Sequence, residues 1–201
     1  GGVDSALLTL ICEKLKKDFK LYVVGLENSK DIKIAKKLAK ERNWDLEIKI
    51  LSEKELEETV EEVVKIVGVN AMKVSIGCVL YSCLRLIKEK IVLSGGGTED
   101  VFAGYKRIRE AKDINEACLK SLKTLWERDI DRDQKISKNF NIKLEYPFLY
   151  EEFISYGLRI KDNLKVNEKG DKYIIRKLAF SLGLSEEYAF RPKLAAQYGS
   201  S

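Results

Sequence analysis

The first half of the chain alternates short apolar segments with amphipathic helical ones, and this alternation limits the possible folds more than any other feature. The pattern predicts helices and strands in the following order: helix 5–19, strand 21–26, helix 31–43, strand 45–51, helix 52–67, helix 72–88 and strand 91–93. Strands separated by helices favour a parallel sheet with helices on both faces. The expected fold class is therefore α/β, with a twisted parallel sheet.

The second half of the chain lacks this alternation and is predicted to be mostly helical. The expected elements are helices 105–111, 114–128, 134–140, 151–159 and 172–182, with one weak strand at 143–146. Neither an internal repeat nor a low-complexity linker interrupts the sequence, so residues 1–201 are expected to form one domain. The sequence opens inside a glycine motif without Met, and we expect a first strand upstream of Gly1.

Composition excludes several classes of function. The 201 residues include no histidine, which rules out Ser-His-Asp and Cys-His chemistry and leaves carboxylates, lysine and bound Mg²⁺ as catalytic groups. The net charge of +5 is spread along the chain without a basic block, which disfavours nucleic-acid binding. The apolar runs are too short or too interrupted to cross a membrane. Four cysteines without CxxC spacing indicate free thiols, so we expect a cytoplasmic protein.

The opening GGVDSALL places small and polar residues directly ahead of a predicted helix. Glycines let a ligand approach the backbone closely, and the N–H groups of a helix N-terminus attract phosphate oxygens. Gly1, Gly2, Asp4 and Ser5 are therefore candidate ligands for an anion. A simple turn followed by a helix cap is the alternative explanation.

A second glycine cluster, VLSGGGTEDVFAGY, follows the last predicted strand, where doubly wound folds bind their ligands. Its acidic residues, Glu99 and Asp100, could supply carboxylates to Mg²⁺. The alternative is a mobile surface loop with a helix that starts at Glu99.

These motifs resemble those of a known family. GGVDS resembles the SGGxDS pyrophosphate loop of the N-type ATP pyrophosphatases, with its first serine upstream of the sequence, and SGGGTEDVFAGY resembles the LSGEGxDExFxGY string of asparagine synthetases and β-lactam synthetases. The segment from Arg128 to Leu149 is similar to the family's RDDRxxxxxGxExRxPFLD stretch. The ending RPKLAAQYGS is closest to the asparagine-synthetase-domain-containing branch.

The resemblance implies a site for ATP and Mg²⁺. Pyrophosphate binding would fall to Gly1, Gly2 and Ser5, and the metal to Asp4 and Glu99. Ser94 and Gly95 match positions near the adenosine, and Leu26 lies in GLENSKD, which is similar to the family's GxxxSxD element beside the adenine. A turn plus helix cap explains GLENSKD equally well.

The predicted catalytic residues are Glu99 and two lysines near the end of the chain, which would supply positive charge. Lys172 opens a predicted helix, and Lys193 lies in the Arg-Pro-Lys motif where the family lysine contacts phosphate and the reaction intermediate. Flexible lysines suit the stabilisation of charge on leaving pyrophosphate. A solvated surface lysine is the alternative for Lys172.

The resemblance implies an ATP-dependent amide-forming synthetase that adenylates a carboxylate, releases pyrophosphate and transfers ammonia or an amine. Gly96 stands where asparagine synthetases have a glutamate, and Tyr150 where they have an aspartate, which puts aspartate in doubt as the substrate. No glutaminase domain is visible, so a glutaminase partner subunit is one expected nitrogen source. A homo-oligomer is left open. The alternatives are a nucleobase- or tRNA-modifying enzyme with the same loop, and a nucleotide-binding regulatory domain without turnover.

Overall fold

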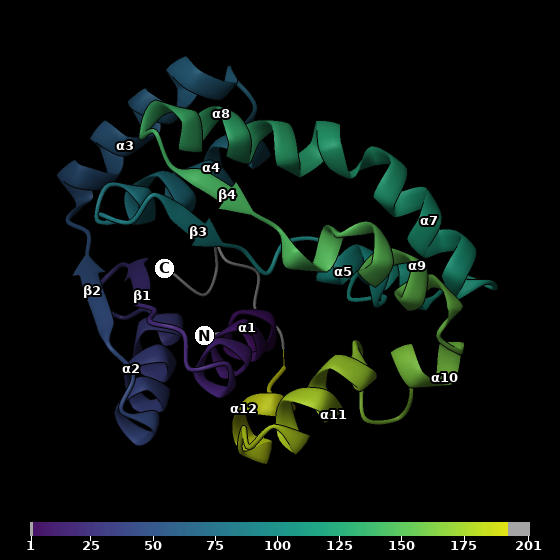
Figure 1. Ribbon diagram of the computed structural model, residues 1–201. Coiled ribbons are helices and arrows are strands. Elements are labelled where there is room, and N and C mark those ends of the chain that lie inside the picture. The colour runs from purple at the N-terminus through teal and green to yellow at the C-terminus, as the bar shows by residue number, and fades with distance from the viewer. Residues whose placement is uncertain (1, 193–201) are drawn as a thin grey trace.

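The structure is a computed structural model that describes residues 2–192. Twelve α-helices, one π-helical turn, one 3₁₀ turn and four strands succeed one another in the described chain (Figure 1). In chain order they are α1 Val3–Lys14, β1 Leu21–Gly25, α2 Lys30–Arg42, β2 Leu46–Ile50, α3 Glu53–Val67, α4 Ala71–Leu84, β3 Ile91–Leu93, α5 Thr98–Val101, α6 Lys106–Arg109, α7 Ile114–Leu125, η1 Trp126–Ile130, α8 Asp131–Asn139, β4 Lys143–Glu145, η2 Pro147–Leu149, α9 Glu151–Arg159, α10 Asp162–Lys165, α11 Tyr173–Ser181 and α12 Glu186–Ala189.

The strands pair in parallel, as the alternating pattern predicts, but the described residues form two separate pairs. β1 pairs with β2, with Leu21 opposite Leu46, and β3 pairs with β4, with Ile91 opposite Lys143. The strand that we expect upstream of Gly1 lies outside the sequence, and the structure does not test it. The α/β class with parallel strands and a mostly helical second half is confirmed, whereas one continuous sheet is not observed.

Local sequence signals explain several of the helix boundaries. Ser52 and Glu55 form the capping box that the sequence predicts at the start of α3, because each side chain accepts a hydrogen bond from the other residue's backbone N–H. Ser29 caps α2 in the same way, by accepting a hydrogen bond from the N–H of Ile32 at 3.2 Å. α1 ends at Lys14, earlier than predicted, and Lys16 adopts a positive φ of 52° just beyond it.

One predicted break between helices is absent. The sequence predicts separate helices at 114–128 and 134–140, but α7 runs into α8 through the π-helical turn η1. π-helical turns inside α-helices are frequent at functional sites. This long helical segment borders a large cavity that is described below.

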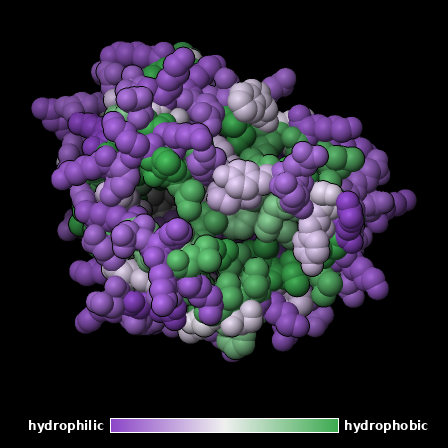
Figure 2. All heavy atoms as spheres, in the orientation of Figure 1, coloured by the Kyte–Doolittle hydropathy of each residue, from purple (hydrophilic) through white to green (hydrophobic). Residues whose placement is uncertain are grey.

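The buried apolar side chains form two main hydrophobic cores. The first joins α1, α2, α11 and the phenylalanines Phe102 and Phe148, and the second joins α3, α4, α8 and β4. Outside the cores, apolar side chains gather in the middle of the face shown in Figure 2, which includes the α9 region. The apolar side chains Ile91 and Leu93 of β3 are also exposed, at 59% and 45%. Strands of parallel sheets are normally covered on both faces, so β3 is less enclosed than a complete sheet would make it.

No single helix of the described part of the chain is long and apolar enough to span a membrane. Only the pair α3 and α4 taken together is long and apolar enough, and the two helices are bent by 116° relative to each other.

Candidate active site

The N-terminus of α1 faces a large cavity. Gly2 precedes the helix in an extended conformation, and Gly2, Asp4 and Ser5 all line the cavity, whose volume is about 870 Å³. A methyl group added to Gly2 would meet no atom within 4 Å, so the backbone there is open to a ligand. The unpaired N–H groups of the first helical turn therefore point toward a space that can accept an anion.

Asp4, Glu99 and Lys172 meet at this helix start. The Lys172 ammonium donates hydrogen bonds to Asp4 Oδ2 at 2.7 Å and to Glu99 Oε1 at 2.6 Å. The Lys172 side chain is only 2% exposed, and those of Asp4 and Glu99 are 18% and 14% exposed. The structure thus brings together the two predicted metal ligands and one of the predicted catalytic lysines.

Burial and charge act in opposite directions on these groups. Burial raises the pKa of Asp4 above its ordinary value, and the neighbouring Lys172 ammonium only partly offsets this effect. Burial alone would lower the pKa of Lys172, but the two carboxylates outweigh it and raise that pKa. Lys172 is therefore a charged ammonium at neutral pH, held between two acids.

Two glycines allow this close assembly. A Cβ on Gly95, which follows β3, would lie 2.8 Å from Asp4 Cβ, so glycine lets the loop approach the start of α1. A Cβ on Gly104 would overlap the carboxylate of Glu99. Gly104 therefore makes room for the side chain of Glu99.

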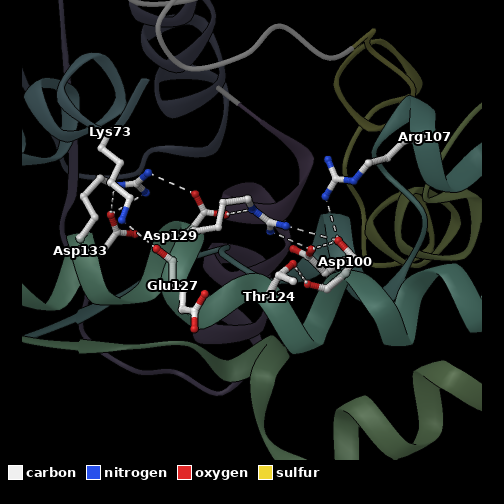
Figure 3. Close-up of polar contacts among 10 residues, drawn as sticks. Lys73, Asp100, Arg107, Thr124, Glu127, Asp129 and Asp133 are labelled. Atoms are coloured by element: carbon white, nitrogen blue, oxygen red, sulfur yellow. Dashed lines mark hydrogen bonds and ion pairs between the residues drawn. The ribbon is translucent and has the colours of Figure 1, made fainter. Parts of the chain in front are cut away.

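A charged wall borders the far side of the cavity, along α7, η1 and α8. Arg128 donates hydrogen bonds to Asp100 at 2.8 Å and to Asp129 at 2.7 Å, and Arg132 binds Asp129 at 3.1 Å and Asp133 at 2.7 Å. Figure 3 shows these alternating charges in a row, with Arg107 at one end and Lys73 and Asp133 at the other. Asp100 is 1% exposed and already bound by Arg128 and Ser121. It is thus less available to a metal than Glu99.

Asp133 and Tyr146 close this wall beside Gly96. The Tyr146 hydroxyl lies 3.4 Å from Asp133 Oδ2, and a Cβ on Gly96 would lie 3.0 Å from the tyrosine ring. Burial raises the pKa of Asp133, although Arg132 opposes this effect. Burial, followed by the charge of Asp133, raises the pKa of Tyr146. Tyr146 thus lies against the position where asparagine synthetases, according to the resemblance, have a glutamate.

Leu26 lies in a second, smaller cavity of about 320 Å³. Its lining is mostly apolar and comes from the ends of β1 and β2 together with α3 and α4. Val79 lines both cavities, so the apolar cavity adjoins the charged one. This arrangement suits a flat apolar group attached to a charged chain.

The remaining predicted site residues have different positions. Ser94 does not line the large cavity, and its hydroxyl accepts a hydrogen bond from the N–H of Gly96 at 3.1 Å, which holds the turn. Gly1 and Lys193 lie outside the described residues, so their predicted roles stay predictions. Arg191, two residues before Lys193, lines the cavity, and its guanidinium lies 3.4 Å from Asp31.

Sequence reasoning assigned no individual role to the Arg and Asp residues of the charged wall. Their spacing is a signal that could have found them, because positions 128, 129, 132 and 133 recur on one side of a helix. Arg176 was also missed. It is buried and donates hydrogen bonds to the carbonyl oxygens of Ala189 and Arg191, at 3.1 and 2.8 Å, which fixes the segment that leads toward Lys193.

The carboxylate pair fits a magnesium ion bound together with a nucleotide. Asp4 Oδ1 is buried and has no hydrogen-bond partner in the part of the chain that is described. The described residues contain no group of three or more potential protein ligands, so protein side chains alone would not enclose a metal ion. Mg²⁺ is commonly bound through one or two carboxylates, with phosphates and water completing its shell. Asp4 and Glu99 would supply the oxygen ligands for such a site.

The fold and the site together define an α/β protein with an anion site at a helix start, a carboxylate pair and a buried lysine. The sequence model of the asparagine synthase family matches residues 1–113 and 106–201. The chain belongs to this family.

Several relatives support this assignment. A Methanocaldococcus jannaschii protein named "Putative asparagine synthetase 1 (glutamine-hydrolyzing)" is 33% identical, over 100% of this chain and 44% of its own length. The glutamine-hydrolyzing asparagine synthetase of Gallus gallus is 30% identical over 99% of this chain and 38% of its own. Asparagine synthetase B of Escherichia coli strain K12 is 26% identical over 96% of this chain and 39% of its own length. The chain thus spans about two fifths of the length of these relatives.

Proposed function

We propose that the chain is an ATP-dependent carbon–nitrogen ligase domain that forms an acyl-adenylate and converts it to an amide. The observation behind this proposal is that Asp4, Glu99 and Lys172 meet at the start of α1 inside one cavity. Membership of the asparagine synthase family supports the same reaction class.

In this proposal ATP spans the two adjoining cavities. The triphosphate would lie at the N-terminus of α1, against Gly2 and Ser5, where backbone N–H groups and the helix dipole favour negative charge. The base would enter the apolar cavity beside Leu26. Mg²⁺, when held by Asp4 and Glu99, would neutralise charge on the phosphates. Lys172 would add a second positive charge next to the leaving pyrophosphate.

The reaction then has two steps. An oxygen of the substrate carboxylate attacks the α-phosphorus, an O–P bond forms, and pyrophosphate leaves. The nitrogen of ammonia or an amine next attacks the acyl carbon, a C–N bond forms, and AMP departs with the bonding electrons. The nitrogen must also lose a proton. Asp133 is a candidate acceptor because burial raises its pKa and it lines the cavity beside Tyr146.

Pyrophosphate release with a panel of carboxylic acids, ammonia and ATP tests the reaction class. With an acid labelled by ¹⁸O in its carboxylate, one labelled oxygen should appear in AMP, because the attacking oxygen stays on phosphorus when the amide forms. Acid-dependent pyrophosphate without label in AMP would refute the acyl-adenylate. Release that depends on tRNA would favour a modifying enzyme, and ATP binding without release would favour a regulatory domain.

The acid itself is not specified by the family assignment. Tyr146 packs against Gly96, so a glutamate side chain at position 96 would displace the ring. This difference from asparagine synthetases is the reason to include acids other than aspartate in the panel.

The nitrogen source follows from the relatives' names, which describe glutamine hydrolysis. We propose that ammonia reaches this domain from a glutaminase part, either in the same polypeptide or in a partner subunit. Amide ¹⁵N from glutamine should then enter the product only when that part is present, whereas labelled ammonia should enter with this domain alone.

We also propose that β1–β2 and β3–β4 are two halves of one twisted sheet. Gly2 is extended, and α1 begins beside Gly95, directly after β3. A strand that precedes α1 would therefore run parallel to β3 and could pair with both β1 and β3. A structure that includes residues ahead of Gly1 would test this arrangement.

A further inference from the structure

The Lys172 ammonium occupies the position between the two carboxylates that a metal ion would need. It lies 2.7 Å from Asp4 Oδ2 and 2.6 Å from Glu99 Oε1. We propose that Lys172 is the resident cation of this carboxylate pair, and that a divalent metal ion binds only when the ammonium leaves at least one of the carboxylates. The nucleotide part of this proposal rests on the proposed function, whereas the competition between lysine and metal does not.

Distance is the first argument for competition. Mg²⁺ binds oxygen at about 2.0 to 2.1 Å, closer than an ammonium approaches a carboxylate. A metal ion bound to the same two oxygens would overlap an ammonium within hydrogen-bond distance of both. One Asp4 oxygen, Oδ1, is buried without a hydrogen-bond partner in the described chain, so the lysine does not satisfy the pair completely.

Charge is the second argument. Two carboxylates and one ammonium leave a net charge of −1 at a site where Lys172 is 2% exposed. Removal of the lysine without a replacement would leave two mostly buried negative charges together, which is unfavourable. The lysine therefore stabilises the assembled pair before any metal arrives.

The backbone around Lys172 allows its side chain to move alone. Asp171 accepts hydrogen bonds from Arg176 at 2.5 Å and from Arg109 at 3.0 Å, which anchors the chain next to Lys172. Lys172 itself is the N-cap of α11, in a left-handed conformation with φ of 48°. Lys172 already lines the cavity, and its flexible four-carbon side chain can move from the carboxylates to another position in that cavity while α11 stays in place.

The consequence is that metal and nucleotide bind cooperatively. A metal ion alone must displace the ammonium into a cavity whose wall acids, Asp100, Asp129 and Asp133, are already paired with arginines, so its affinity is low. Bound phosphates give the ammonium a new partner, and the carboxylates become available to the metal. Each ligand then increases the affinity of the other by the same factor.

The test is a titration of the chain with Mn²⁺ in the absence of nucleotide. The electron paramagnetic resonance signal of free Mn²⁺ measures how much of the metal is bound. For the wild-type chain we expect no binding below about 1 mM that depends on Asp4. Lys172→Met should bind Mn²⁺ at least about tenfold more tightly than wild type, and Asp4→Asn in the Lys172→Met background should abolish the gain. Lys135→Met is the matched control, because Lys135 forms a surface ion pair with Asp131 at 2.8 Å away from this cavity.

Two results would overturn the proposal. One is unchanged or weaker Mn²⁺ binding by folded Lys172→Met. The other is submillimolar Mn²⁺ binding by the wild type that Asp4→Asn removes, and this measurement does not require Lys172→Met to fold. Because neither assay uses ATP or an acid substrate, failure of the ligase assay would leave these results unaffected.

Discussion

Replacement of Gly104 by alanine tests how tightly the site is assembled. The new Cβ would overlap the Glu99 carboxylate and would also lie 3.1 Å from the Glu99 Cα. The Glu99 side chain must therefore turn away and lose its hydrogen bond with the buried Lys172 ammonium. Overpacking costs about 1 to 3 kcal/mol, and the loss of a charged hydrogen bond costs about 1.5 to 3 kcal/mol. Gly104 does not have a positive φ, so the expected cost is steric and electrostatic.

The combined loss is about 2.5 to 6 kcal/mol, which lowers the Tm of a chain of this size by roughly 5 to 24 °C. Calorimetry of Gly104→Ala against wild type measures the shift. Gly2→Ala is the control, since its methyl group meets no atom within 4 Å. In a Glu99→Asp background, the shorter arm should reduce the cost of Gly104→Ala by about 2 kcal/mol. A Gly104→Ala melting temperature within 2 °C of wild type, or equal costs in both backgrounds, would refute this reasoning.

Three further changes have expected outcomes. Lys172→Met should remove the charge that partly offsets the burial of Asp4, so the folded-state pKa of Asp4 lies further above its unfolded value. The stability of the variant then falls as pH rises from about 4 to 7, and its deficit against wild type reaches about 3 to 5 kcal/mol. Urea unfolding at several pH values measures this deficit, and a pH-independent deficit would contradict it. Leu26→Trp should fill the apolar cavity and weaken ATP binding at least about tenfold by calorimetric titration, whereas unchanged affinity would exclude the base from that cavity. Arg176→Met should leave Asp171 without one of its two arginines and destabilise the chain by about 3 kcal/mol in the same urea assay, with a loss below 1 kcal/mol as the contrary result.

The elements of the first half could be predicted because their signals are local. Strands 21–26 and 45–51 and the capping box at Ser52 each depend on residues within a few positions of one another, and the structure confirms them within one or two residues at most ends. The break predicted between residues 128 and 134 was wrong because the prediction relied on the local apolar pattern alone. Charged residues interrupt the apolar pattern there, but they face the cavity in one continuous helical run.

The candidate site could be predicted only in part. Glycines next to acidic residues identified Asp4 and Glu99, whose residue types suit phosphate and metal chemistry. The pairing of Lys172 with both could not be predicted, because 168 and 73 residues separate it from them. No short-range pattern specifies such a contact. The role of Gly104 could not be predicted either, because only the structure shows that the Glu99 carboxylate occupies the space beside it.

Glu99, Gly104 and Lys172 are best understood as one coupled set. According to the resemblance, Glu99 replaces a shorter aspartate, and the extra methylene takes its carboxylate into the space that Gly104 leaves open. From there it reaches an ammonium that is also bound to Asp4. Burial of the charges of Asp4, Glu99 and Lys172 is costly unless each is paired. A change at Glu99, Gly104 or Lys172 therefore weakens the whole assembly. The lysine therefore stabilises the assembled carboxylate pair before ligands bind, and on our proposal a metal ion binds tightly only when phosphates draw that lysine away.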